Sequence, residues 1–108
     1  MSERVALVQM CSGTAVEANL AAIETAVAEA AAGGARYVLT PEMSVLFAEN
    51  RQMLAERALP FEGNEALDRL AATAREHAIV LHLGSMPFAL GDGRFANRSL
   101  VFSESGQI

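Results

Sequence analysis

The sequence predicts an α/β fold built on a mixed β-sheet, and three patterns support this prediction. Short apolar runs of strand length alternate with stretches of helical periodicity. A strand, a helix and a second strand follow one another between residues 5 and 40, which is the length of a βαβ unit with parallel strands. A Gly-Asp-Gly turn later joins two strand-like runs, so we expect that pair of strands to be antiparallel.

The composition narrows the class of protein. The 108 residues are enough for one small domain or for part of a larger one. Eight arginines, no lysine and a net charge of -5 argue against binding to a nucleic-acid backbone. A single cysteine excludes an internal disulfide framework and a thiolate metal cluster. The apolar runs are too short to span a membrane and the N-terminus does not resemble a secretory signal, so we expect a cytoplasmic protein.

The first strand and the first helix are predicted within residues 5–34. Residues 5–10, VALVQM, form an apolar run that is typical of a buried strand. Thr14 and Glu17 fit a capping box that would begin a helix, and Gly33 with Gly34 would end it. The apolar stripe of this helix recurs at three- and four-residue steps and consists of Val16, Leu20, Ile23, Val27 and Ala30.

The alternation of elements continues through the middle of the chain. We expect a strand over residues 36–40 that ends at Pro41, a short helix over 50–58 and a longer helix over 64–77. Met53 and Leu54 would face inward in the short helix, and Asn64 would cap the longer one. The inward stripe of the longer helix consists of Leu67, Leu70, Ala71 and Ala74.

The last third of the chain predicts an antiparallel pair of strands. Residues 79–83 form a third strand that Gly84 would close, and residues 95–103 form a fourth strand after the turn at 90–94. Residues 107–108 would begin a fifth strand. Such a sheet would leave an unprotected edge, so we expect residues 1–108 to be the incomplete, N-terminal part of a larger α/β domain.

Glu42 is the candidate catalytic residue. It follows the second predicted strand, and the carboxyl ends of parallel strands are where open α/β sheets bind their ligands. Pro41 restrains the backbone beside it, and a carboxylate that is partly buried there would suit general acid or base catalysis. A solvent-exposed residue at the start of a loop is the alternative, and position alone leaves both interpretations open.

The other chemically active side chains favour structural roles. Cys11 has no base at a suitable spacing, so we expect a small thiol in the core. His82 is expected to be a hydrogen-bonded core residue and His77 to end a helix, and their spacing matches no zinc motif. Asn97 is expected to make structural hydrogen bonds. No dinucleotide or Walker motif occurs, so neither a metal nor a cofactor is implied.

The order of the motifs resembles a known family. VALVQM, a helix ending in GGAR, YVLTPEMS, LHLGSM, the GDGR turn and FANRSLVFSESGQI are similar to the N-terminal part of the nitrilase, or carbon–nitrogen hydrolase, superfamily. The resemblance covers essentially the whole chain. Within that superfamily it is strongest to the small amidases that act on ω-amides and deaminated glutathione.

This resemblance implies a fold, an activity and one site residue. The fold would be a four-layer α-β-β-α sandwich, of which this chain supplies a sheet with helices on one face, and the complete protein would be a homodimer. The substrate would be a small amide, nitrile or carbamoyl compound that is cleaved by a Glu–Lys–Cys triad. Glu42 matches the general base of that triad. The family's lysine and cysteine lie beyond Ile108, and Cys11 does not match the nucleophile. Phe47 is a candidate pocket residue, with a core position as the alternative.

Two hypotheses about function follow from the sequence. The first is the N-terminal segment of an amidase-type hydrolase, without activity on its own. The second is a non-catalytic paralogue that acts as a dimerising α/β module. The downstream reading frame separates them, because the hydrolase requires a lysine and a cysteine after Ile108.

Overall fold

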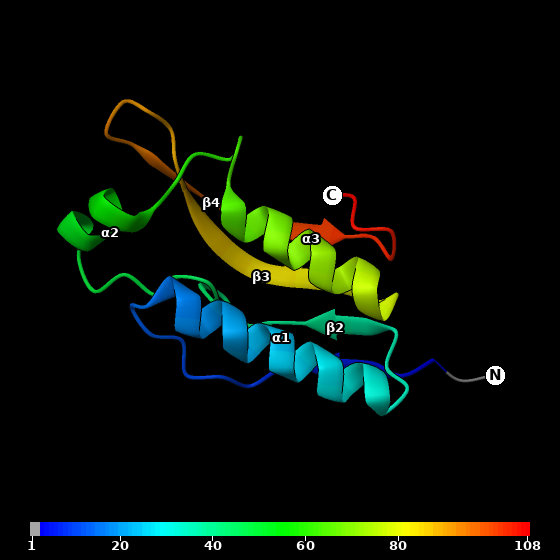
Figure 1. Cartoon of the computed structure of the whole chain (residues 1–108). Helices are drawn as coiled ribbons and strands as arrows, with labels where there is room; N and C mark the ends of the chain where they lie inside the picture. Colours follow the sequence, from blue (N-terminus) through cyan, green and yellow to red (C-terminus); the bar gives the residue numbers. More distant parts are fainter. Residues whose placement is uncertain (1–2) are drawn as a thin grey trace.

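A mixed β-sheet with two helices against one face forms the body of the molecule (Figure 1). The computed structural model describes residues 3–108. The elements follow in the order β1 (Val5–Leu7), α1 (Val16–Ala32), β2 (Tyr37–Leu39), α2 (Arg51–Arg57), α3 (Glu65–His77), β3 (Val80–Ala89) and β4 (Phe95–Phe102). The predicted α/β class is confirmed. No helix among these residues is long and apolar enough to cross a bilayer.

The strand order β1-β2-β3-β4 follows the sequence. The first three strands are parallel, with Val5 opposite Tyr37 and Tyr37 opposite Val80. β4 runs antiparallel to β3 after the tight turn, as predicted. The carboxyl ends of the parallel strands therefore lie along one edge of the sheet, and the segment that follows β2 leaves the sheet there (Figure 1).

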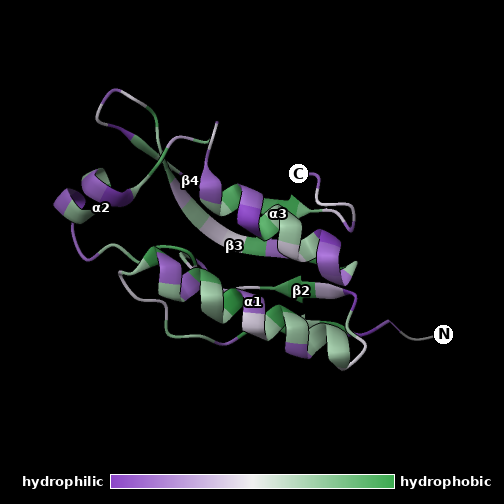
Figure 2. Ribbon diagram, in the orientation of Figure 1, coloured by the Kyte–Doolittle hydropathy of each residue, from purple (hydrophilic) through white to green (hydrophobic). Residues whose placement is uncertain are grey.

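The hydrophobic core lies between the sheet and the helices α1 and α3. Both helical stripes predicted from the sequence enter it, with Leu20, Ile23 and Val27 buried on one helix and Leu67 and Leu70 on the other. Their partners on the sheet are fully buried and alternate along the strands, namely Val38, Leu81, Leu83 and Phe102. α2 stands apart from this core and buries no residue, although Met53 and Leu54 are half-buried as expected; Figure 2 shows it as mostly hydrophilic.

The opposite face of the sheet carries exposed apolar side chains and is uncovered by any element of residues 3–108. Val5 is 63% exposed, Leu7 is 72% exposed and Val101 is 46% exposed. These residues alternate along their strands with the residues that face the helices, so they point to the other side of the sheet. Helices on one face only is the arrangement that the sequence predicted.

The beginning of α1 differs from the prediction. The capping box at Thr14 is wrong, because the helix begins at Val16 with Ala15 at the N-cap and no side-chain cap. Thr14 therefore lies one residue outside the capping position. Asn19 secures this end of the helix instead: its Oδ1 accepts from the Gly13 N–H at 3.0 Å, and its Nδ2 donates to the carbonyl oxygens of Gly13 at 2.9 Å and Val45 at 2.8 Å.

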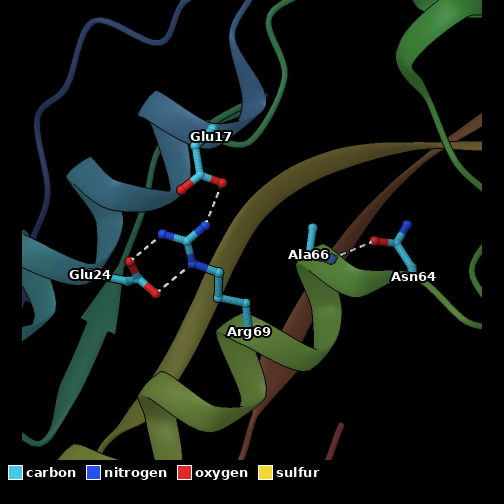
Figure 3. Close-up of polar contacts among 5 residues, drawn as sticks. All are labelled: Glu17, Glu24, Asn64, Ala66 and Arg69. Atoms are coloured by element: carbon cyan, nitrogen blue, oxygen red, sulfur yellow. Dashed lines mark hydrogen bonds and ion pairs between the residues drawn. The ribbon is translucent and has the colours of Figure 1, made fainter.

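Glu17, the other half of the predicted box, instead contributes to an ionic contact between the two helices (Figure 3). Arg69 on α3 donates to both carboxylate oxygens of Glu24 at 2.7 Å and to one oxygen of Glu17 at 2.6 Å. The hydrogen bonds from Arg69 hold the pKa of the Glu24 carboxyl below its usual range, against the smaller effect of burial. Hydrogen bonds to Glu24 and Glu17 raise the pKa of Arg69. These ion pairs join α1 to α3 through charged groups.

The strand bounds also differ from the prediction. β1 ends at Leu7 rather than at residue 10, and the expected fifth strand is wrong because Gln107 and Ile108 lie outside any strand. β3 is longer than expected and continues through Gly84 to Ala89. Pairing with β4 carries it past the glycine, and the register shifts between Leu83 and Met86 at that point.

Asn64 caps α3 as predicted, and its contribution to stability can be measured. Its Oδ1 accepts from the Ala66 N–H at 3.0 Å (Figure 3). Its Nδ2 donates to the Pro60 carbonyl at 3.0 Å. We expect Asn64→Ala to lower the free energy of unfolding by about 1–2 kcal/mol. Thr14→Ala, which removes no cap, should change it by less than about 0.5 kcal/mol. Urea denaturation followed by circular dichroism compares the two variants, and equal losses would contradict the assigned caps.

Candidate active site

Glu42 lies just past β2, at the carboxyl edge of the parallel strands. This is the position expected from the sequence, where open α/β sheets bind ligands. The side chain is exposed rather than buried in this chain, which is one of the two positions that the sequence left open. Among residues 3–108 the carboxylate has no ion-pair partner. The carboxylate is therefore free to contact a group that approaches from outside these residues.

The backbone before Glu42 is held firmly even though its side chain is not. The buried Thr40 donates its N–H to the His82 carbonyl at 3.0 Å, which continues the pairing of β2 with β3. Its hydroxyl lies 2.9 Å from that of the fully buried Ser44 and accepts from the Gly84 N–H at 3.2 Å. Gly84 packs so closely that a Cβ there would lie 2.4 Å from the Thr40 carbonyl oxygen. The Glu42 carboxylate is thus exposed, whereas the backbone that leads to it is held by hydrogen bonds and close packing.

A hollow of about 370 Å³ surrounds Glu42 on one side, and it is lined by Met10, Cys11, Ser12, Pro41, Glu42 and Phe47. Phe47 is 52% exposed here, so the structure places it beside Glu42 and not in the core. Cys11 is also exposed, and the expected core thiol is wrong because β1 ends at Leu7 and leaves the following residues outside the sheet.

A larger cavity of about 580 Å³ opens between α2 and the β3–β4 turn, and it is lined by Met43, Arg51, Leu54, Pro87, Arg94, Phe95, Ala96 and Asn97. Arg51 donates to the Gly93 carbonyl at 2.9 Å and lies over the Phe95 ring. Arg94 pairs with Asp92 at 2.7 Å, and this contact lowers the pKa of the Asp92 carboxyl. Neither arginine could be predicted as a cavity residue from the sequence, because their approach depends on how the turn folds back toward α2.

The two histidines and Asn97 do not join Glu42. His82 lies between the Tyr37 hydroxyl, which contacts Nδ1, and the Ser99 hydroxyl, which lies 2.9 Å from Nε2. Because Ser99 donates its hydrogen to the Leu83 carbonyl, its oxygen is left to accept from Nε2 of His82. His82 is thus hydrogen-bonded as expected, although half-buried on the open face of the sheet rather than in the core. Asn97 lines the larger cavity.

The described part of the chain offers no candidate metal centre. No group of three or more His, Cys, Asp and Glu side chains in residues 3–108 is arranged to hold a metal ion. The group that the site offers for proton transfer is therefore the exposed carboxylate of Glu42 on the turn after β2. Glu42 can accept and return a proton if a partner group is brought within hydrogen-bonding distance.

The fold and this site together define an α/β protein that presents a potential general base at the carboxyl edge of its parallel strands. Residues 4–108 match the model of the carbon-nitrogen hydrolase family. The chain belongs to that family, and the membership predicted from its motifs is confirmed.

Two amidases are similar to this chain and are much longer than it is. It is 30% identical over 106 residues to the deaminated glutathione amidase of Yersinia enterocolitica, a match that covers 96% of this chain and 36% of that protein. It superposes with a TM-score of 0.83 and 27% identity on a solved amidase of Nesterenkonia sp. AN1, covering 98% of this chain and 41% of that one. A solved variant of that amidase, described as a nitrilase-superfamily enzyme, has 28% identity and a TM-score of 0.84. The chain thus spans less than half the length of these proteins.

Proposed function

We propose that this chain is the N-terminal part of a carbon–nitrogen hydrolase domain that cleaves small-molecule amides, with Glu42 as the general base of a Glu–Lys–Cys triad. The observation that supports this proposal most directly is an exposed carboxylate on a rigid turn at the ligand-binding edge of the sheet. Family membership and the amidase relatives support the reaction class. A homodimeric full-length protein located in the cytoplasm is part of the same proposal.

In the proposed reaction, Glu42 moves protons for a cysteine outside this sequence. The carboxylate takes the thiol proton as sulfur attacks the amide carbon, and a lysine from outside the sequence stabilises the oxyanion. The protonated Glu42 then gives its proton to the leaving ammonia or amine, which leaves a thioester. In the second half, Glu42 removes a proton from a water molecule as its oxygen attacks the thioester carbon. Glu42 then returns that proton to the departing thiolate, which releases the acid and restores both the thiol and the Glu42 carboxylate. In a solved glutamate-to-glutamine variant of the Nesterenkonia amidase, acrylamide is joined to the active-site cysteine by Michael addition, which supports a reactive cysteine in that relative.

The sequence of this chain sets a clear expectation for an activity assay. It contains no lysine, and its one cysteine, Cys11, is assigned no catalytic role, so two of the three proposed catalytic groups are missing. We expect the purified 108-residue chain to release no ammonia above background from amide, carbamoyl or nitrile substrates. A matched Glu42→Gln chain corrects for background hydrolysis. Turnover that depends on Glu42 in the 108-residue chain would contradict the proposal that the lysine and the cysteine of the triad lie outside this chain.

The coding sequence that follows Ile108 tests the proposal against the non-catalytic alternative. The hydrolase requires codons for a lysine at a strand end and for a cysteine further on. A stop codon directly after Ile108 would favour the non-catalytic module.

A further inference from the structure

We propose that Ser85 is a positioning residue for Glu42, a role that rests on the proposed function of Glu42 as general base. Ser85 is a buried residue of β3 and lies 42 positions beyond Met43, the residue that directly follows Glu42. Its hydroxyl oxygen accepts the Met43 N–H at 2.8 Å. Nothing in the local sequence links the two residues, so the contact exists only because the fold brings β3 against the turn after β2.

The conformation of Met43 gives this hydrogen bond its importance. Met43 has a φ of 52°, in the left-handed region that side chains other than glycine seldom adopt. Such a conformation persists where the surrounding structure holds it in place, and it is common at active sites. The hydroxyl of Ser85 supplies that restraint, because it fixes the direction of the Met43 N–H and so the peptide that joins Met43 to Glu42.

The irregular stretch of β3 places Ser85 where this contact is possible. The register with β4 shifts between Leu83 and Met86, and Gly84 and Ser85 lie within the shift. Gly84 brings the β3 backbone against the Thr40–Pro41 peptide, where a Cβ would have no space. The next residue then reaches past the proline to the far side of Glu42. A β-bulge that redirects a side chain beside an active site is a recurrent arrangement in proteins.

Glu42 is therefore fixed from both sides through its neighbours. Thr40 holds the chain before it through the Gly84 N–H, and Met43 holds the chain after it through the Ser85 hydroxyl. The exposed carboxylate itself has no ion-pair partner within residues 3–108 to fix its direction. The backbone of the turn must then determine where the carboxylate points. Loss of the Ser85 hydroxyl removes one of the two restraints on this turn.

The test uses the full-length protein that contains this segment, with an amide substrate. We expect Ser85→Ala to lower kcat by roughly 10- to 100-fold, because small displacements of a catalytic group are costly, while KM changes by less than about twofold. Ser85→Thr keeps a hydroxyl and should restore most of kcat. Thr73→Val is the matched control, because Thr73 is also buried and donates its hydroxyl to the Arg69 carbonyl, far from Glu42 in the fold. It should lower the melting temperature without lowering kcat.

A second measurement covers the case in which Ser85→Ala folds poorly. In the 108-residue chain, Ser85→Thr should leave the Met43 amide slow to exchange with deuterium, whereas Ser85→Ala should speed exchange at Met43 more than at Val45. Wild-type kcat in Ser85→Ala, together with an inactive Glu42→Gln, would overturn the positioning role and leave the proposed function intact. Full activity in Glu42→Gln would overturn the proposed function, whatever Ser85 does.

Discussion

Glu42→Gln is expected to lower kcat of the full-length protein by roughly 10²- to 10⁴-fold, the contribution of a positioned general base. Glutamine keeps the size and most of the polarity of glutamate but cannot take a proton from a thiol or from water. Because the Glu42 side chain is exposed and unpaired within residues 3–108, the substitution removes no contact that stabilises the fold. Loss of activity should therefore occur without loss of stability.

The measurement combines steady-state kinetics with thermal unfolding. Glu49→Gln is the matched control, since Glu49 is exposed on the same connecting segment and its substitution removes the same charge. We expect it to keep wild-type kcat, and both variants should unfold within about 0.5 kcal/mol of the wild type. Wild-type turnover in Glu42→Gln would remove this residue from the mechanism. An equal loss in Glu49→Gln would point to the charge of the segment rather than to a base.

Gly84→Ala is expected to have the largest effect on stability, a loss of roughly 3 kcal/mol, at the upper end of the range for overpacked cores. The added Cβ would lie 2.4 Å from the Thr40 carbonyl oxygen and 2.5 Å from the Pro41 carbonyl carbon. These are backbone atoms of the turn that carries Glu42, so no side chain can rotate away to make room. Either β3 must separate from β2 or the turn must move.

Urea denaturation of the 108-residue chain measures this loss, with Gly13→Ala as the control. A Cβ at Gly13 would have no atom within 4 Å, and that substitution should change the free energy of unfolding by less than about 0.5 kcal/mol. If the two alanine variants were equally stable, the close contact between Gly84 and the turn would be wrong.

The sequence predicted the elements whose signals are local. The apolar stripes of α1 and α3 follow from periodicity alone, and Asn64 follows from its place directly before a helical stripe. The sequence predicts that Gly84 ends a strand, because glycine usually interrupts one. Its actual role depends on the Thr40–Pro41 peptide, which lies more than forty residues earlier in the chain.

The candidate site could be predicted only in part, because some of its contacts join residues that are far apart in the sequence. Glu42 could be chosen because it follows a strand and a proline. Ser85 and Arg51 could not, because their contacts with Met43 and Gly93 each span 42 residues of sequence. Asn19 carries a weak signal in the sequence, because an amide beside Leu20 on the buried side of a helix must find hydrogen-bond partners. In the structure these are backbone groups of two separate segments.

The contact between Ser85 and the turn after β2 also has a consequence during synthesis. Ribosomes add roughly 5–20 residues per second, so the chain is extended for roughly 2–8 seconds after Met43 before the 42nd following residue, Ser85, is made. Throughout that interval the turn has neither the Gly84 N–H nor the Ser85 hydroxyl as a partner. The geometry around Glu42 is thus acquired late, and a nascent chain that stalls before Gly84 carries the glutamate without the support that orients it.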